Sequence, residues 1–289
     1  MEGFVKVPGG RLWYELRGED TEGIPLLTIH GGPGVPHNYL QTLEMLENER
    51  PVVFYDQLGC GKSDRPSDKS LWRIERFVEE IELLRSELGY SEIHLLGHSW
   101  GTILACEYAL KYPETVKSMV LSGPAMSISR FESDARRLME TLSVRSREAI
   151  NRAEKSGDFT QEDYQEAVSE FYGKFVCRMK PWPECMNEAV AGMGEDVYNY
   201  MYGPSEFTVT GVLKGYDCSS RLGEINSPVL LTCGKYDEAT PEATAFYTEK
   251  FPNAVIRVFE ESSHEHHLEK PLEYIQEVRQ FLTRAELTS

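Results

Sequence analysis

The segment IHLLGHSWG at residues 93–101 carries the strongest structural signal in this sequence of 289 residues. Residues 93–96 form a short apolar run that suits a buried strand, and residues 102–111 show a helical pattern. Between them lies the motif G-x-S-x-G, with Ser99 at its centre. Glycine on both sides permits a sharp strand-to-helix turn that lifts the serine hydroxyl above the sheet edge, beside the helix N-terminus. We therefore predict that Ser99 is a nucleophile; the alternative is a glycine-rich turn with a capping serine.

Short apolar runs recur on both sides of this segment. Residues 25–29, 52–55 and 116–121 are bounded by Gly, Pro or Asp and predict strands buried on both faces of a parallel sheet. Residues 74–88 show apolar side chains at i, i+3 and i+4 spacing, which is typical of a helix packed on such a sheet. Near the N-terminus, Pro-Gly-Gly at residues 8–10 separates two strand patterns and predicts a hairpin. The alternation indicates an α/β protein.

Residues 124–220 interrupt this alternation with polar helical segments that contain no strand-like run. Strand patterns return afterwards at residues 229–233 and 254–259. The simplest account is a core domain of residues 1–123 and 221–289, with a helical cap domain at 124–220 inserted after the sixth strand. We expect the cap to cover the C-terminal edge of the sheet and to close the pocket from water.

A serine hydroxyl attacks a carbonyl only when a base takes its proton. In this type of fold the acid and then the base follow the serine along the chain, each beyond the end of a strand. Asp237 and His264 both follow predicted strands in this order. We predict that His264 is the base and that Asp237 orients its ring, with His266 or His267 as the competing bases.

A second glycine-rich segment, HGGPG at residues 30–34, follows the strand predicted at 25–29. Glycines there leave backbone N–H groups free. We expect the N–H of Gly32 and that of Trp100 to form an oxyanion hole, which stabilises the charge that develops on a carbonyl oxygen. The alternative is a plain turn.

Composition excludes several classes of function. The chain has 47 acidic and 30 basic residues and a formal net charge of −17, so we expect neither nucleic acid nor a membrane as a partner. Its apolar runs are far shorter than the roughly 18 residues of a membrane helix. The start of the chain, MEGFVKVPGG, shows no secretory signal, and the six cysteines form no CxxC pair, so reduced thiols in the cytoplasm are expected. The oligomeric state stays open, with a monomer favoured.

Two apparent ligand motifs fail on inspection. HEHH at residues 264–267 is not HExxH, because residue 268 is leucine and the two histidines of that motif must lie four residues apart. GCGKS at residues 59–63 resembles a phosphate-binding loop, but the first glycine of that loop would fall on Asp56. We therefore expect no metal and no cofactor.

Taken together, these segments resemble the proline iminopeptidase family (prolyl aminopeptidases), which has the α/β-hydrolase fold. The blocks HGGPG at 30–34, FYDQLGCGKSD at 54–64, GHSWG at 97–101 and GKYDEATP at 234–241 are similar to those of the family. In the insertion, GPSEFTVTG at 203–211 resembles the cap segment of the monomeric subgroup, which includes the archaeal tricorn-associated aminopeptidase. The family often has GGSWG or GSSYG in place of GHSWG.

The resemblance implies a mostly parallel central sheet flanked by helices, and a serine exopeptidase that needs no cofactor. Such an enzyme releases an N-terminal residue, preferably proline, from short peptides with a free N-terminus through an acyl-enzyme intermediate. The residues implied are the triad Ser99, Asp237 and His264, the oxyanion donors Gly32 and Trp100, and the amine-binding carboxylates Glu206 and Glu238.

Two alternatives remain open from the sequence. The first is a broader-specificity amino-acid amidase or esterase of the same fold, which the triad does not exclude. The second is a non-catalytic small-molecule receptor; the intact oxyanion segment and the two acidic positions count against it.

Overall fold

The computed structural model describes residues 1–287. Its centre is an eight-stranded sheet in the order β1-β2-β4-β3-β5-β6-β7-β8. β2 runs antiparallel to both of its neighbours, and the strands from β4 to β8 run parallel. The α/β prediction is confirmed, and each predicted strand is present. The strands are β1 (Glu2–Val7), β2 (Gly10–Arg17), β3 (Leu26–Ile29), β4 (Val52–Tyr55), β5 (Ile93–His98), β6 (Val116–Ser122), β7 (Val229–Gly234) and β8 (Ala254–Phe259).

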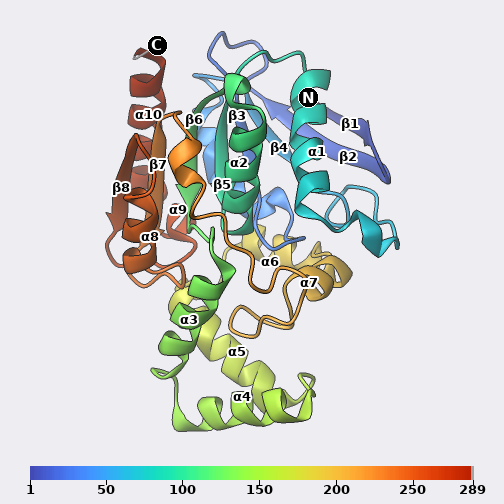
Figure 1. The fold of residues 1–289 in the computed structure, drawn as a ribbon, viewed down its shortest axis with the longest axis vertical. Coiled ribbons are helices and arrows are strands. Elements are labelled where there is room, and N and C mark those ends of the chain that lie inside the picture. The colour runs from blue at the N-terminus through green and yellow to red at the C-terminus, as the bar shows by residue number, and fades with distance from the viewer. Residues whose placement is uncertain (288–289) are drawn as a thin grey trace.

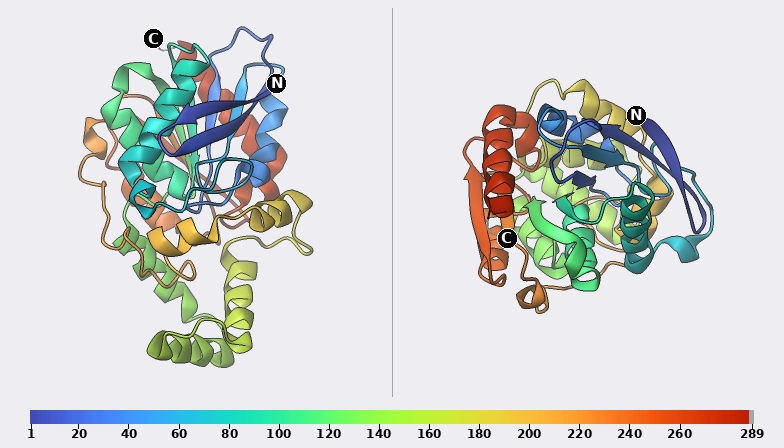
Figure 2. Two further views of the ribbon diagram at one scale, coloured as in Figure 1. Left: turned by 90° about the vertical axis from the view of Figure 1, so that its right-hand side faces the viewer. Right: turned by 90° about the horizontal axis from the view of Figure 1, so that it is seen from above.

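Helices cover both faces of the sheet (Figure 2). α1, α2 and α8 pack on one face, and α10 packs with η1 and α9 on the other. The short 3₁₀ segments η2, η3 and η4 join the larger elements. The helices of the core are η1 (His37–Leu46), η2 (Lys69–Leu71), α1 (Ile74–Glu87), α2 (Trp100–Lys111), η3 (Pro113–Thr115), η4 (Leu222–Glu224), α8 (Pro241–Thr248), α9 (His266–Glu269) and α10 (Pro271–Leu287).

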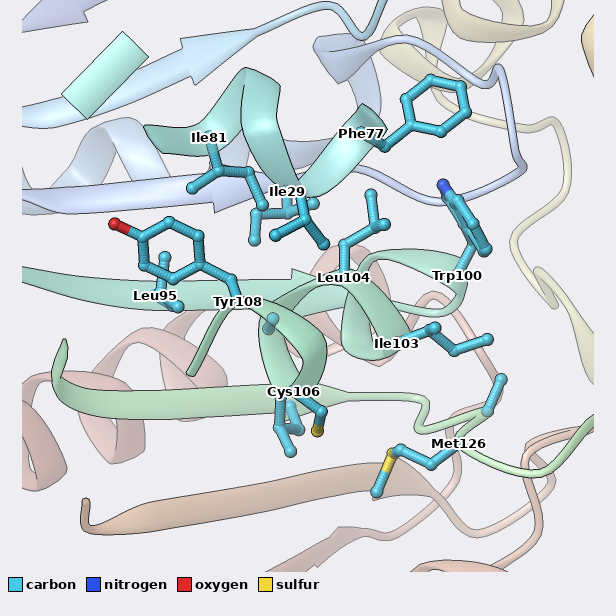
Figure 3. Close-up of a cluster of buried hydrophobic side chains, with 14 of the residues drawn as sticks. Ile29, Phe77, Ile81, Leu95, Trp100, Ile103, Leu104, Cys106, Tyr108 and Met126 are labelled. Atoms are coloured by element: carbon cyan, nitrogen blue, oxygen red, sulfur yellow. The ribbon is translucent and has the colours of Figure 1, made fainter. Parts of the chain in front are cut away.

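The parallel strands are apolar on both faces because successive side chains point to opposite sides. Leu27 of β3 packs in the cluster on the α1 and α2 side, and its neighbour Leu26 packs in the cluster on the α10 side. Figure 3 shows the first cluster, in which side chains of α1 and α2 meet side chains of the sheet strands. There the ring of Phe77 on α1 meets the ring of Trp100 edge-on at 5.9 Å. This packing fixes the start of α2, next to Ser99.

The sequence prediction missed η1. Its buried residues include His37, Leu40, Leu43 and Leu46, which recur every three positions. That spacing matches the three residues per turn of a 3₁₀-helix and not the 3.6 of an α-helix. The signal was present in the sequence, but it does not fit the α-helical pattern on which the prediction rested.

Helices α3 to α7 lie between β6 and β7, as the predicted insertion requires. Figure 1 shows them beyond the end of the sheet that lies opposite the two chain termini. α3, α4 and α5 enclose a hydrophobic cluster of their own. Side chains of α6 belong to the core cluster on the α10 side, and side chains of α7 belong to the one on the α1 and α2 side. A cap domain of residues 124–220 remains our proposal. The helices are α3 (Ile128–Met139), α4 (Val144–Ser156), α5 (Glu162–Phe175), α6 (Glu184–Ala191) and α7 (Glu195–Met201).

The close contact between α2 and β3 gives a test of the fold. A Cβ added at Gly101 would lie 2.1 Å from the carbonyl oxygen of Ile29, which belongs to the backbone and cannot yield easily. We expect Gly101→Ala to lower the free energy of unfolding by about 3 kcal/mol. Gly173→Ala in α5 is the control, because a Cβ there meets nothing within 4 Å and should stabilise the helix by about 0.5–1 kcal/mol. Urea unfolding of both variants measures the difference, and equal stability would contradict the tight contact.

Candidate active site

Ser99 stands at the turn between β5 and α2 in a conformation that residues other than glycine rarely adopt, with φ 53° and ψ −121°. Its N–H donates to the carbonyl of Ser122 at 2.9 Å. A Cβ at Gly97 would lie 2.4 Å from the carbonyl oxygen of Gly101, so the chain can cross itself here only with glycine. The turn therefore presents the Ser99 side chain at the carboxyl end of β5, beside the N-terminus of α2.

His264 and Asp237 come together at the same edge of the sheet. The Nδ1 of His264 lies 2.7 Å from Oδ1 of Asp237, and both side chains are buried. Asp237 also accepts the N–H groups of Ala239 at 2.8 Å and Gly234 at 3.2 Å, which hold the carboxylate in place. With Nδ1 on the carboxylate, Nε2 of His264 is left to exchange a proton with a substrate or a nucleophile.

The two competing histidines have other partners. Nε2 of His266 lies 2.9 Å from the hydroxyl oxygen of Thr232, and its Nδ1 is 3.7 Å from Asp237. Burial lowers the pKa of His266 to about 3, so it stays neutral. Nε2 of His267 bonds to the carbonyl oxygen of Tyr39 at 3.0 Å. Within residues 1–287, His264 is the one of the three whose ring is within hydrogen-bonding distance of Asp237.

The ring of His264 lies directly against the backbone of Gly123. A Cβ at Gly123 would be 2.5 Å from Cε1 of His264 and 2.7 Å from its Nδ1. Gly123 has φ 57°, and it directly follows Ser122, which accepts the N–H of Ser99. The loop after β6 therefore contacts both the serine turn and the histidine.

Four of the predicted site residues line one small cavity: Gly32, Ser99, Trp100 and Glu206. Gly32 has φ 109°, which favours glycine, and Trp100 is the first residue of α2, where the backbone N–H has no partner inside the helix. An oxyanion hole formed by these two N–H groups at the Ser99 side chain remains our proposal. Glu238 is not part of the cavity wall.

Gln57 links Trp100 to His30, at the start of the loop that contains Gly32, and the sequence prediction did not single it out. Its Oε1 accepts the indole N–H of Trp100 at 2.9 Å, and its Nε2 donates to the carbonyl of His30 at 3.0 Å. Its backbone N–H also donates to Nε2 of His30 at 2.9 Å. The available signal was an amide side chain two residues beyond β4, at the sheet edge where the other site residues lie.

Glu206 lines the cavity at Ser99 from the helical insertion, and Glu238 lies beside His264. The hydroxyl of Tyr198 donates to Oε1 of Glu206 at 2.6 Å. Glu238 is buried, and its Oε2 has no hydrogen-bond partner. Burial raises the pKa of Glu206, and burial together with the charge of Glu206 raises that of Glu238 well above its usual range. Glu238 is buried and Glu206 is half-buried, and two carboxylates that repel each other form a site in which a cation would be stabilised.

His264 is surrounded by negative charge. Its Nε2 lies 3.9 Å from Oε1 of Glu238. Burial by itself would lower the pKa of His264, but Asp237, Glu238 and Glu265 outweigh burial and raise it to about 10. The neighbouring carboxylates therefore favour the protonated form of the His264 ring in the empty site.

One group of side chains among residues 1–287 has spacing that could suit a metal ion: His98, Glu265 and His267. Nε2 of His98 lies 3.2 Å from the carbonyl oxygen of His264, and Nε2 of His267 lies 3.0 Å from that of Tyr39. Because a carbonyl oxygen only accepts, both nitrogens carry hydrogens and offer no lone pair to a metal. These two nitrogens are therefore not available to a metal ion in this arrangement.

Known proteins share this chain's fold and most of its length. A sequence profile described as the alpha/beta hydrolase fold matches residues 24–271. The proline iminopeptidase of Heyndrickxia coagulans is 45% identical over 282 residues, which cover 97% of this chain and 98% of that protein. The proline iminopeptidase of Saccharolobus solfataricus is 37% identical, and the match covers 97% of this chain and 92% of that protein. This chain belongs to the proline iminopeptidase family.

Solved structures agree with this assignment to the proline iminopeptidase family. The crystal structure of the proline iminopeptidase from Mycobacterium smegmatis matches with a TM-score of 0.91 at 34% identity, covering 100% of this chain and 99% of that one. The crystal structure of VinJ matches with a TM-score of 0.95 at 31% identity, covering 99% of both chains. The fold and the hydrolase class predicted from the sequence are confirmed. Among the described residues, no helix is long and apolar enough to cross a membrane.

The contact between Gly123 and His264 gives a test of the site. Gly123→Ala would push the His264 ring away from its position, and we expect hydrolytic turnover to fall about 100-fold, as displacements near 1 Å can cause. Gly89→Ala is the matched control: Gly89 also has a positive φ, +76°, but a Cβ there meets nothing within 4 Å. It should cost stability and leave turnover unchanged. Steady-state kinetics with a small ester compare the two, and normal turnover in Gly123→Ala would show that the glycine does not fix the ring.

Proposed function

We propose that this protein is a serine exopeptidase that releases an N-terminal residue, preferably proline, from short peptides. The observation that carries the proposal is the pair of carboxylates, Glu206 and Glu238, that repel each other beside the candidate triad. A free N-terminal amine is a cation, and such a pair is suited to bind it. The similarity to curated proline iminopeptidases over nearly the whole chain supports the same reading.

The cavity at Ser99 supports a small, apolar N-terminal residue. Its wall includes Phe131, Tyr202 and Leu213, which offer apolar surface to a pyrrolidine ring. Glu206 lies in the same wall. An amine held by the two carboxylates would set the distance from the N-terminus to Ser99, so that only the first carbonyl reaches the hydroxyl. This arrangement accounts for exopeptidase and not endopeptidase activity.

Ser99 attacks the first carbonyl while His264 takes the hydroxyl proton through Nε2. The N–H groups of Gly32 and Trp100 stabilise the resulting oxyanion. His264 then gives the proton to the leaving amine, and an acyl-enzyme remains. Water, deprotonated by His264, hydrolyses the acyl-enzyme, and the amino acid leaves.

Substrate binding supports the base role of His264 electrostatically. In the empty site, nearby carboxylates hold His264 in its protonated form. A substrate ammonium beside Glu206 and Glu238 cancels part of their charge, which lowers the pKa of His264 and releases its proton. The neutral base then forms in the complex, where it is needed.

We also propose a cytoplasmic location and peptide substrates as the partners. All six cysteines are free thiols in the structure, and five of them are buried. Reduced thiols are the rule in the cytoplasm.

The role of Ser99 is tested by Ser99→Ala. We expect kcat for a prolyl arylamide to fall roughly 10⁴- to 10⁶-fold, because no other group can form the acyl-enzyme. Chelators should have no effect on the wild type. Circular dichroism checks that the variant is folded. Substantial activity in the variant, or loss of wild-type activity with EDTA, would refute the serine mechanism.

The two glutamates are tested with matched substrates. Glu206→Gln and Glu238→Gln should each reduce kcat/KM for the prolyl arylamide by about 100-fold or more, since losing one partner of a buried charge pair typically costs ~3–5 kcal/mol. Hydrolysis of a small uncharged ester should fall much less. N-acetyl-prolyl arylamide should be nearly inert with the wild type. Equal losses on ester and amide, or rapid cleavage of the acetylated compound, would favour the amidase or esterase alternative.

The pH dependence tests the charge environment of His264. A raised pKa keeps the ring protonated to higher pH, so activity that needs the neutral base is lost as pH falls through that value. With an uncharged ester, the pH profile of kcat/KM reports ionisations of the free enzyme. We expect a limb on which kcat/KM rises with pH, with its midpoint well above the usual histidine pKa of 6.5. Glu238→Gln removes an anion 3.9 Å from Nε2 and should shift that limb down by about one pH unit. An unchanged limb would exclude Glu238 as a cause.

A further inference from the structure

A buried chain of hydrogen bonds connects the glycine-rich loop after β3 to the backbone of the candidate base. The N–H of Gly31 donates to the hydroxyl oxygen of Tyr39 at 2.7 Å. That hydroxyl lies 3.0 Å from Nδ1 of His98, and Nε2 of His98 lies 3.2 Å from the carbonyl oxygen of His264. Tyr39 and His98 are each 2% exposed. Neither residue had a role in the sequence prediction.

The partners fix the direction of every bond in this chain. The Tyr39 oxygen accepts a hydrogen from Gly31, so its own hydrogen has one described acceptor, Nδ1 of His98. An acceptor Nδ1 means that the neutral His98 ring carries its hydrogen on Nε2. That N–H points to the carbonyl of His264, which can only accept. The reverse tautomer would leave the Tyr39 hydrogen buried and unpaired, at a cost in free energy.

These bonds join the three segments that hold the predicted oxyanion donor, nucleophile and base. Gly31 precedes the oxyanion donor Gly32, His98 precedes the nucleophile Ser99, and the acceptor carbonyl belongs to His264 itself. We propose that Tyr39 and His98 are positioning residues. They set the positions of two loops relative to Ser99: the glycine-rich loop at residues 30–34 and the loop that carries His264. This inference rests on the proposed serine mechanism and adds two residues that touch no substrate.

Close packing alone does not explain this pair. A phenylalanine and a leucine would fill a core of this kind without the cost of burying a hydroxyl and an imidazole. Burial lowers the pKa of His98 well below its usual value, which keeps the ring neutral and preserves its donor and acceptor ends. His98 also contacts the His264 ring, with centroids 4.6 Å apart. A shift of His98 would therefore move the base directly.

Single substitutions can remove chosen bonds of this network. Tyr39→Phe removes only the hydroxyl, and with it the links to Gly31 and to Nδ1 of His98. His98→Gln keeps a donor near the position of Nε2 and loses the acceptor. His98→Asn keeps an acceptor near the position of Nδ1 and loses the donor to His264. Tyr108→Phe is the matched control, since this buried tyrosine bonds to Glu82 and Thr115, away from the site.

Steady-state kinetics with a prolyl arylamide measure the effect. We expect Tyr39→Phe and both His98 variants to lower kcat by about 10- to 100-fold, because misplaced groups lose transition-state stabilisation, with KM changed about twofold at most. Tyr108→Phe should keep the wild-type kcat even if its melting temperature falls. The boronic acid analogue of proline, which binds Ser99 as a tetrahedral adduct, should bind about 10- to 100-fold more weakly to Tyr39→Phe. The product proline should bind as it does to the wild type.

A double-mutant cycle separates positioning from general loosening of the core. Tyr39→Phe and His98→Gln both remove the bond between Tyr39 and His98, and Tyr39→Phe also removes the bond from Gly31, so the double variant should be little worse than Tyr39→Phe alone. Tyr39→Phe combined with His98→Asn cuts both ends and should show nearly multiplied losses. Tyr39→Phe with wild-type kcat and boronate affinity would overturn the inference, as would equal weakening of boronate and proline. If the His98 variants do not fold, the comparison of Tyr39→Phe with Tyr108→Phe still decides. Ser99→Ala in the same assay tests the serine mechanism separately.

Discussion

The backbone conformation of Ser99 is the constraint on which the rest of the active centre depends. A φ of 53° is costly for a serine, and it persists because the surrounding structure leaves no alternative. β5 is held on both sides by parallel strands, and α2 is held by apolar contacts with α1 and the sheet. Gly97 and Gly101 let these two elements meet without a clash. The strain is therefore balanced by packing over a large part of the core, which holds the backbone of Ser99 in this conformation.

Buried polar contacts hold the glycine-rich loop at residues 30–34 and the loop that carries His264 in place beside Ser99. Gln57 connects the indole of Trp100 to the loop at residues 30–34, and the hydroxyl of Tyr39 reaches the same loop from η1. Such side chains are expensive to bury unless every bond is made, so they favour one arrangement of the loops over others. The apolar core fixes the arrangement of the strands and helices, and these polar contacts fix the positions of the loops.

The helical insertion contacts the candidate active site in two ways. It contains Glu206, and it also forms hydrogen bonds with the backbone of the loop that carries His264. Carbonyl groups at the C-terminal end of α5 have no partners inside the helix. Those of Phe175 and Val176 accept the N–H groups of His264 at 3.1 Å and of Glu265 at 2.9 Å. The helical insertion and His264 are therefore in direct contact, so a movement of α5 would displace His264.

The sequence alone determined the fold class, because hydrophobic periodicity reports directly on which faces of a strand or helix are buried. The eight strands, the helical insertion and the turn at Ser99 all follow from local patterns and from glycine positions. The order of Ser99, Asp237 and His264 along the chain was also readable, since each follows a strand and parallel strands end at one edge. The assignment of Glu206 and Glu238 came from resemblance to a family and not from any local pattern.

Only the tertiary structure decided which histidine meets Asp237, since three histidines lie within four positions and the sequence cannot measure a distance of 2.7 Å. It also decided the contacts of Gln57, Tyr39 and His98. These side chains bond to residues between 8 and 166 positions away along the chain, and a local pattern holds no information on such pairs. The pKa values of His264 and Glu238 follow the same rule, because they depend on charges and burial that exist only once the chain has folded.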